Sequence, residues 1–506
     1  MSGPAELLLD GNSLSLDQLR VFDSQRPSVS LSQSARERMQ ASVEVVRDAV
    51  ASNRLAYGIT TGFGAFANKR ISSDQLRQLQ VNLLRSHTTG VGTPLAESLV
   101  RRLLLLKINA LAVGVSGIRQ ELIDALLALL NSDVVPIIPE RGSVGASGDL
   151  APLAHMSLCL IGEGEAIHHG KRIEGATVCE AAGFQPLTLE AKEGLALING
   201  TQLSLALALN GLFEAEALLD AAVVIGALTV DGLAGSYTPF DVRIHEASRL
   251  PHQVAIARRF GALLTQSAIH SDHENCDRVQ DPYAVRCMPQ VFGAIEAALD
   301  HARSVLASAI NGVSDNPLIF GNDIVSGGNF HAEPLAMISD YMAIAVSELA
   351  SMSERRTDLL DRRVNPALNM FLTTEPGLES GFMIAHVTAA ALTSENRTLA
   401  HPASVDNVTT SAGQEDHVSM APWAGYKLRR ICENTANVLA IELLAAAHAI
   451  DKLKPLKTTD KLQQVHAFVR RHVEYRPYDH RLDRDIAVLA RLIESGALSQ
   501  FLKDGR

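Results

Sequence analysis

The sequence predicts a mainly α-helical protein, on three observations. Long stretches rich in Leu and Ala carry apolar residues three or four positions apart, as on one face of a helix. Aromatic residues make up only 4% of the 506 residues, with one Trp, so the core must be built mainly from Leu, Ala, Val and Ile. Alternation of polar and apolar residues, typical of strands, is scarce. Together these features favour helices packed on helices.

The helical stretches follow one another along the chain. Residues 34–52 carry Met39, Val43 and Val46 at helical spacing, with charged residues between them. Residues 95–130 predict two helices, because Gly-Val-Ser-Gly at residues 114–117 interrupts the pattern. Further helices are expected at residues 201–230, 288–310, 332–353, 380–399 and 427–450. Short strands are expected only at residues 166–173 and 318–326, each next to a glycine.

The two parts of the chain differ in the length of their helical stretches and in their glycine content. Up to about residue 200 the sequence mixes shorter helical stretches with glycine-rich loops, whereas the remainder consists of long helical stretches, as in a helix bundle. We therefore expect an N-terminal lobe at residues 1–200 and a long helical bundle domain at residues 201–506.

Composition excludes several classes of protein. The chain has 45 basic and 56 acidic residues, a net charge of −11, and no long basic run, which argues against binding of nucleic acid or of an anionic membrane. Its five Cys are widely spaced and include no Cys-x-x-Cys pair, which disfavours a disulfide framework. Residues 1–16 lack the features of a signal peptide, and the apolar residues 438–450 include Glu442 and His448. We expect a cytoplasmic protein.

A glycine-rich string stands at residues 141–152, Arg-Gly-Ser-Val-Gly-Ala-Ser-Gly-Asp-Leu-Ala-Pro. Asp149 is a favourable N-cap residue and Pro152 is tolerated in the first turn of a helix, so residues 146–148 are expected in a tight loop at a helix N-terminus. The pattern alone indicates a glycine-rich helix entry. The alternative of a phosphate-binding loop is disfavoured, because G-x-x-x-x-G-K-[ST] is absent.

Residues 145–155, Gly-Ala-Ser-Gly-Asp-Leu-Ala-Pro-Leu-Ala-His, resemble the signature of the aromatic amino-acid ammonia-lyases and aminomutases. In that family the Ala-Ser-Gly tripeptide cyclises and loses two waters to form 4-methylidene-imidazol-5-one (MIO), an electrophile. The resemblance implies that Ala146, Ser147 and Gly148 form this group. The residue types suit the chemistry, because Gly148 has no Cβ to obstruct the closure and the Ser147 hydroxyl can leave as water. It also implies the all-α ammonia-lyase/fumarase-like fold.

Residues 57–64, Tyr-Gly-Ile-Thr-Thr-Gly-Phe-Gly, resemble the family's loop that carries the catalytic base. Alone, the string would indicate a turn with a structural Tyr. The resemblance makes Tyr57 the base that removes a weakly acidic β-proton. A phenolate fits this role if neighbouring positive or dipolar groups depress its pKa.

Residues 279–287, Val-Gln-Asp-Pro-Tyr-Ala-Val-Arg-Cys, form a third matching string. Pro282 stands where a helix would begin, and Tyr283 and Arg286 would share one face of that helix. Taken alone, Arg286 would be a surface ion-pair residue. By resemblance Arg286 binds the substrate carboxylate as a bidentate fork, Gln280 helps to organise the site and Tyr283 assists the amine chemistry.

Four more strings match in chain order, at residues 195–202, 314–334, 401–406 and 414–420. Alone, they would indicate polar caps, turns and a core Phe. The resemblance implies that Asn199 contacts the substrate carboxylate and the prosthetic ring, and that Phe330 forms an aromatic wall beside the ring.

Two positions bear on the substrate. His87 follows Ser86, a pair that resembles the histidine-specific branch of the family, and an imidazole there can exchange a hydrogen bond with a substrate imidazole. Glu415 stands where phenylalanine lyases generally have Gln, and a carboxylate there can act in proton transfer. The resemblance implies elimination of ammonia from L-histidine to give trans-urocanate.

Departures from the common histidine-specific pattern keep alternatives open. Thr88 and Thr89 replace small residues, and Gly413 replaces the usual Asn. A tyrosine or phenylalanine lyase and an aromatic 2,3-aminomutase remain alternatives, since they use the same prosthetic group. A non-enzymatic helical scaffold is disfavoured by the intact Ala-Ser-Gly, Tyr57 and Arg286.

The resemblance further implies a homotetramer in which each active site takes residues from several subunits, consistent with long apolar helices that one chain alone would leave exposed. It implies no metal and no dissociable cofactor. His168 and His169 are adjacent and lack the i, i+4 ligand spacing of a metal-binding helix.

Overall fold

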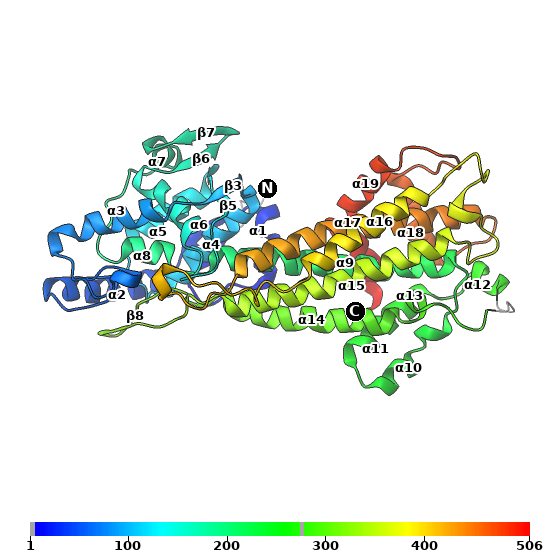
Figure 1. Ribbon diagram of the computed structural model, residues 1–506, viewed down its shortest axis with the longest axis horizontal. Coiled ribbons are helices and arrows are strands. Elements are labelled where there is room, and N and C mark those ends of the chain that lie inside the picture. The colour runs from blue at the N-terminus through cyan, green and yellow to red at the C-terminus, as the bar shows by residue number, and fades with distance from the viewer. Residues whose placement is uncertain (1–5, 274–277, 506) are drawn as a thin grey trace. The chain divides into compact units, whose positions relative to one another are not determined.

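A computed structural model describes residues 6–273 and 278–505 and confirms a mainly α-helical protein (Figure 1). The chain forms two compact units. The first unit comprises residues 1–209, 304–339 and 403–426, and the second comprises residues 210–303, 340–402 and 427–506. The expected division near residue 200 into a lobe and a bundle domain stays a prediction.

The first unit combines helices of moderate length with several short strands. Its helices are α1 (Leu16–Gln25), α2 (Gln33–Ala51), α3 (Leu76–His87), α4 (Glu97–Ala112), α5 (Gln120–Asn131), α6 (Leu150–Leu158), α7 (Ala176–Ala182) and α8 (Glu193–Ile198). Its strands are β1 (Glu6–Leu9), β2 (Ser28–Leu31), β3 (Val91–Pro94), β4 (Val134–Pro136), β5 (Pro139–Arg141), β6 (Glu165–His168), β7 (Lys171–Glu174), β8 (Leu318–Phe320) and β9 (Asp323–Val325).

Local sequence signals account for the helices expected in this unit. The hydroxyl of Ser32 caps α2 by accepting from the N–H of Ala35, and the apolar residues Met39, Val43 and Val46 are buried. The stretch at residues 95–130 forms α4 and α5, separated at the expected glycines. Both predictions are confirmed.

Strand predictions were less complete. The expected strands at residues 166–173 and 318–326 are each an antiparallel hairpin, β6–β7 and β8–β9. The parallel pair β1–β2, the antiparallel pair β3–β5 and the strand β4, which joins β6, were not expected. These strands have only three or four residues, too few for a periodic pattern to be distinguished from a loop.

The second unit is built on long helices that lie side by side (Figure 1). The helices with residues in this unit are α9 (Gln202–Gly232), α10 (Val242–Ser248), α11 (Pro251–Leu263), α12 (Ala268–Asp272), α13 (Tyr283–Arg286), α14 (Met288–Ala309), α15 (Glu333–Asp361), α16 (Met383–Leu399), α17 (Ala421–Lys452), α18 (Asp460–His472) and α19 (Asp483–Glu494). All five long helices expected from the sequence are present, α15 and α17 being longer than expected. The α9 helix is buried on nearly all sides, as its Leu/Ala sequence predicts.

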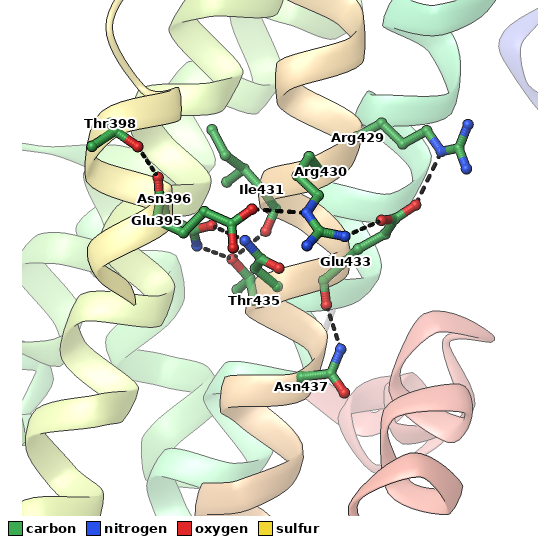
Figure 2. Close-up of polar contacts among 10 residues, drawn as sticks. Glu395, Asn396, Thr398, Arg429, Arg430, Ile431, Glu433, Thr435 and Asn437 are labelled. Atoms are coloured by element: carbon green, nitrogen blue, oxygen red, sulfur yellow. Dashed lines mark hydrogen bonds and ion pairs between the residues drawn. The ribbon is translucent and has the colours of Figure 1, made fainter. Parts of the chain in front are cut away.

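Polar contacts fix the pairing of helices within the second unit. Asn396 of α16 donates from Nδ2 to the hydroxyl of Thr435 in α17 at 3.2 Å, and Arg430 pairs with Glu395 at 2.9 Å (Figure 2). A fully buried ion pair joins α15 to α17, since Arg356 donates to both carboxylate oxygens of Glu442 at 2.6 and 2.7 Å. Removing one partner of such a pair would leave a buried charge uncompensated and would destabilise the packing of α15 against α17.

Two features bear on compartment and oxidation state. Within the described chain, α15 is long and apolar enough to cross a membrane by length and composition, but 67% of its most apolar stretch is buried inside the protein, which is typical of a core helix. Cys159, Cys179, Cys287 and Cys432 carry free thiols, and Cys276 lies outside the described residues.

Candidate active site

The glycine-rich loop adopts a backbone that few residue types tolerate. Ser147 has φ 51° and Gly148 has φ 81°, both in the left-handed region. Gly148 bridges to Gly200, and a Cβ at position 148 would lie 2.2 Å from the Gly200 carbonyl oxygen. The neighbouring N–H of Asp149 donates to that same oxygen at 2.7 Å. The loop is thus held tightly at the start of α6, and only glycine fits at position 148.

Asp149 occupies the N-cap position of α6, as expected, but its side chain makes no capping hydrogen bond. Its carboxylate instead accepts from the N–H and the hydroxyl of Ser204 at 2.8 and 2.9 Å, and from the Ser143 hydroxyl at 3.4 Å. Burial raises the pKa of Asp149 to about 6. The residue therefore ties the loop to the start of α9 rather than capping α6.

A cavity of about 1190 Å³ opens beside this loop, lined entirely by residues of the first unit. It brings together side chains that are far apart in the sequence. Among its lining residues are the predicted site residues Tyr57, His87, Ala146, Ser147, Asn199, Phe330 and Glu415. Gly148 lies in the same loop without lining the cavity.

Ser147 is held from two sides. Its hydroxyl donates to Oε1 of Glu415 at 3.0 Å, and its carbonyl oxygen accepts from Nδ2 of Asn199 at 2.9 Å. Glu415 is itself fixed, because its Oε2 accepts from the hydroxyls of Thr410 and Ser411 at 2.8 and 2.7 Å. A carboxylate thus faces a serine hydroxyl while an amide donor faces the serine carbonyl, an arrangement suited to proton transfer and to stabilisation of charge on that oxygen.

The side-chain oxygen of Asn199 lacks a hydrogen-bond partner among the described residues. This oxygen, Oδ1, is buried, although buried polar atoms are normally paired. A ligand donor near the loop would satisfy it.

His87 ends α3 with one ring nitrogen committed to the protein. Its Nδ1 lies 2.8 Å from the Leu83 carbonyl oxygen and 3.0 Å from the Ser86 hydroxyl. Since a carbonyl can only accept, we assign the proton to Nδ1, which leaves Nε2 as an acceptor. Burial lowers the pKa of His87 and keeps the ring neutral near pH 7. His87 can therefore accept a hydrogen bond from a ligand.

Tyr57 and Phe330 complete the cavity wall. The Tyr57 hydroxyl accepts from the N–H of Gly64 at 3.3 Å, so the glycine-rich loop at residues 57–64 folds back on its own tyrosine. Phe330 follows the β8–β9 hairpin and is half-buried.

The remaining predicted site residues, Gln280, Tyr283 and Arg286, belong to the second unit and do not line this cavity. Pro282 is the N-cap of α13, and the Arg286 guanidinium lies 4.7 Å from the centre of the Tyr283 ring, which confirms that these two side chains share one face. Gln280 and Tyr283 are exposed. The Nε of Arg286 has no hydrogen-bond partner among the described residues.

A cluster of buried charges next to the loop was not predicted from the sequence. Lys107 of α4 donates from Nζ to the Asn199 carbonyl oxygen at 2.9 Å, and Lys192 pairs with Asp315 at 2.6 Å. All three residues are at least 95% buried. Burial lowers the pKa of Lys107 to about 7. The available signal was a Lys that directly follows four leucines, where a long apolar run favours burial of its neighbours.

One group of side chains in the described chain could hold a metal ion. Ligand atoms of His331, Glu333 and His417 lie within 4.8 Å of one another, and two histidines with a carboxylate suit a transition-metal ion. His331 Nε2 already lies 3.2 Å from the His417 carbonyl oxygen. The expectation that the chemistry needs no metal stays a prediction.

Comparison with known proteins identifies the relatives of this chain. Residues 14–471 match the family described as aromatic amino acid lyase. The chain is 50% identical to a histidine ammonia-lyase of Pseudomonas fluorescens over 492 residues, which cover 97% of this chain and 96% of the relative.

Two solved structures share the fold over almost their whole length. The histidine ammonia-lyase of Trypanosoma cruzi superposes with a TM-score of 0.91 at 38% identity, covering 99% of this chain and 95% of that one. A tyrosine aminomutase from Streptomyces globisporus superposes with a TM-score of 0.92 at 33% identity, covering 99% of both chains. The fold expected from the motifs is therefore confirmed.

Proposed function

The chain belongs to the aromatic amino acid lyase family, and on that premise we propose that it is a histidine ammonia-lyase, which converts L-histidine to trans-urocanate and ammonia. The observation that carries the proposal is the arrangement around Ser147. Its backbone is left-handed, its hydroxyl faces the Glu415 carboxylate and its carbonyl faces the Asn199 amide.

The loop fits formation of MIO from Ala146, Ser147 and Gly148. The amide nitrogen of Gly148 would bond to the carbonyl carbon of Ala146, whose oxygen leaves as water. Ser147 then loses its α-proton and its hydroxyl as a second water, which leaves an exocyclic methylene. A Cβ at position 148 would collide with the Gly200 carbonyl oxygen, so the glycine that the closure needs is also the residue that the packing requires. When formed, the group supplies an electrophilic carbon to the substrate.

The residues that line the cavity have distinct roles in this proposed reaction. Tyr57 removes a β-proton of the substrate, the electron pair forms the Cα–Cβ double bond, and ammonia leaves from Cα. Glu415 holds or moves protons beside Ser147, supported by the hydroxyls of Thr410 and Ser411. Asn199 donates to the Ser147 carbonyl oxygen, on which negative charge develops, and Phe330 provides an apolar wall beside the loop.

His87 supports histidine as the substrate. Its free Nε2, in a half-buried ring that lines the cavity, can accept a hydrogen bond from the imidazole N–H of histidine, whereas the phenyl ring of phenylalanine offers no donor to it. A tyrosine hydroxyl could also donate, so a tyrosine-directed aminomutase is the second candidate. The 33% identity to a tyrosine aminomutase over nearly the whole chain is the reason to include tyrosine among the substrates tested.

We further propose that the active enzyme is a homotetramer and that Gln280, Tyr283 and Arg286 reach an active site of another subunit. The unpartnered Nε of Arg286 and the exposure of Tyr283 are consistent with a role that the single chain does not complete. Arg286 would bind the substrate carboxylate as a bidentate fork. We also propose a cytoplasmic location, in keeping with the free thiols of the four described cysteines.

Product analysis and intact-protein mass test the proposal together. The purified protein is incubated with L-histidine, L-tyrosine and L-phenylalanine, and its mass is compared with that calculated from the sequence. We expect trans-urocanate from histidine and a mass lower by two waters. Ser147→Ala should lack the mass deficit and the activity. Ser157→Ala should keep both, because Ser157 is a buried serine of α6 whose hydroxyl bonds, among the described residues, only to the Leu153 carbonyl.

Three results would contradict the proposal. A β-amino acid as the main product would identify an aminomutase. No product from histidine would exclude the histidine-specific assignment. A full-mass protein would exclude the prosthetic group.

A further inference from the structure

Lys107 is a buried cation with an unusual partner. It lies on α4, is 1% exposed, and donates from Nζ to the carbonyl oxygen of Asn199 at 2.9 Å. Within the part of the chain that the structure describes, this is the one hydrogen bond of its ammonium group. Asp315, the carboxylate with the largest electrostatic effect on Lys107, is already paired with Lys192 at 2.6 Å.

Burying this ammonium group is unfavourable for the fold. An ammonium group that leaves water needs a counter-ion or several hydrogen bonds to recover its hydration free energy, and Lys107 has a single neutral acceptor. Burial accordingly lowers its pKa to about 7. Leu103, Leu104 and Leu111, which lie on the same face of α4, are apolar and buried, so an apolar residue at position 107 would suit the packing alone. A lysine at this place therefore indicates a role beyond packing.

The carbonyl that Lys107 holds belongs to a residue of the proposed active site. Asn199 follows α8 as its C-cap, and its side chain donates from Nδ2 to the Ser147 carbonyl oxygen. The next carbonyl, that of Gly200, accepts the N–H of Asp149 at 2.7 Å. Residues 199 and 200 are thus fixed through both carbonyls, one by Lys107 and one by the residue that ends the glycine-rich loop.

This fixation determines where the Asn199 amide points. The backbone carbonyl of a C-cap residue has no hydrogen-bond partner within the helix. A donor from outside the helix can therefore set the orientation of this peptide group and of the attached side chain. Lys107 is that donor. The chain of contacts runs from Lys107 through Asn199 to the oxygen of Ser147.

We propose that Lys107 is a positioning residue of the active site, which holds the Asn199 backbone so that its carboxamide grips the Ser147 carbonyl oxygen. The inference rests on the proposed function, because its consequence is chemical. Loss of the α-proton of Ser147 places negative charge on that oxygen before the hydroxide departs from Cβ and leaves, with a proton, as water. Addition of the substrate to the methylene carbon so formed would move an electron pair to the same oxygen. In both steps an aligned amide donor lowers the barrier.

Lys107→Met tests the inference, because Met keeps the length of the side chain and removes the donor. Arg101→Met is the matched control, since Arg101 is a buried cation of the same helix that donates to a different backbone carbonyl, that of Leu130, at 2.9 Å. Extent of water loss is read from intact mass, and kcat and KM for histidine are measured on the fraction that has lost both waters. Thermal unfolding reports the structural cost of each change.

We expect Lys107→Met to show incomplete or slowed water loss and a kcat lower by on the order of 10- to 100-fold, with a smaller change in KM. Arg101→Met should lose stability yet keep the full mass deficit and the wild-type kcat. The inference is wrong if Lys107→Met has the full deficit and a kcat within about 2-fold of the control, where a 2-fold change corresponds to only ~0.4 kcal/mol.

A second comparison keeps the inference testable should Lys107→Met fold poorly. If Lys107 acts through Asn199, Lys107→Arg, which retains a donor with altered reach, should lower kcat in the wild-type background and have no further effect in Asn199→Ala. Equal effects in both backgrounds would overturn the inference. A wild-type protein without the mass deficit would instead refute the proposed function, so the two failures are distinguishable.

Discussion

The hydroxyl of Ser147 donates a hydrogen bond to the carboxylate of Glu415 at 3.0 Å, although 268 residues separate the two in the sequence. The contact joins the glycine-rich loop before α6 to the loop before α17. It places a carboxylate, itself held by two hydroxyls, against the one side-chain oxygen that must leave the loop if Ser147 is to become a dehydrated residue. The same carboxylate then faces the substrate space in the cavity.

Glu415→Gln is expected to lower kcat by on the order of 10²-fold or more, because the amide keeps the shape of the side chain but can no longer accept a proton. In addition, the NH2 group of Gln would either face the hydroxyls of Thr410 and Ser411, which now donate to Glu415, or point toward Ser147. Steady-state kinetics with histidine and intact mass distinguish an effect on turnover from an effect on water loss.

Asp416→Asn is the control for this prediction. It removes the next carboxylate along the chain, which also lines the cavity but is exposed. Its kcat should stay within about 3-fold of wild type, a change of ~0.7 kcal/mol. A Glu415→Gln enzyme as active as Asp416→Asn would show that the Ser147–Glu415 contact has no chemical role.

Gly148→Ala should prevent both dense packing of the loop and formation of the prosthetic group. The added Cβ would lie 2.2 Å from the Gly200 carbonyl oxygen, and an alanine would be strained in the left-handed backbone conformation at φ 81°. Gly170→Ala is a matched control, because Gly170 has φ 75° and a Cβ there meets nothing within 4 Å. Gly170→Ala should lose roughly 1–2 kcal/mol of unfolding free energy in denaturant titration and keep its mass deficit.

Gly148→Ala should lose more unfolding free energy than this control and show the full, undehydrated mass. Equal destabilisation of the two variants, with the deficit retained in both, would mean that the contact with Gly200 is relieved at little cost. That result would also remove the packing argument for glycine at position 148.

His87→Leu tests the recognition of the substrate ring. Leucine is of similar size but removes the Nε2 acceptor, so kcat/KM for histidine should fall on the order of 10-fold or more through loss of the hydrogen bond to the substrate imidazole. His168→Leu, in the β6–β7 hairpin away from the cavity lining, should leave kcat/KM unchanged. A His87→Leu enzyme with undiminished kcat/KM for histidine would show that His87 does not contact the imidazole.

The helical fold was predictable because long Leu/Ala helices leave a periodic pattern, whereas strands of three or four residues, such as β1 and β2, leave almost none. The cavity residues Tyr57, Ser147 and Glu415 were predicted from family motifs and not from spacing, since nothing in the sequence states that segments so far apart will meet. The role of Lys107 could not be predicted. The pattern of α4 shows that the side chain is buried, but only the tertiary structure shows which carbonyl its ammonium meets.

The same limit explains the outcome at Asp149. The sequence correctly predicted the N-cap position, but the carboxylate accepts hydrogen bonds from Ser204, 55 positions away, instead of capping α6. The assignments of Gln280, Tyr283 and Arg286 to the site stay predictions, because these residues belong to the second unit and are not among those that line the cavity of the first. If the site is shared between copies of the chain, as we propose, no local sequence pattern would reveal the partner surface.

Asp361 predicts a pH dependence of stability. Both of its carboxylate oxygens are buried without a hydrogen-bond partner among the described residues, and burial, followed by the charge of Asp358, raises its pKa to about 7. Since the folded-state pKa exceeds the unfolded value of 3.8, the folded protein binds the proton more tightly. Its stabilising contribution is complete below about pH 4 and is lost as the pH rises to about 7, by at most ~1.4 kcal/mol per pH unit.

Urea unfolding at pH 5 and pH 8 should therefore show a smaller loss of stability in Asp361→Asn than in wild type. Asp323→Asn, an exposed carboxyl in the β8–β9 hairpin, should behave as wild type, and a parallel pH dependence in all three proteins would show that Asp361 is not protonated in the folded state.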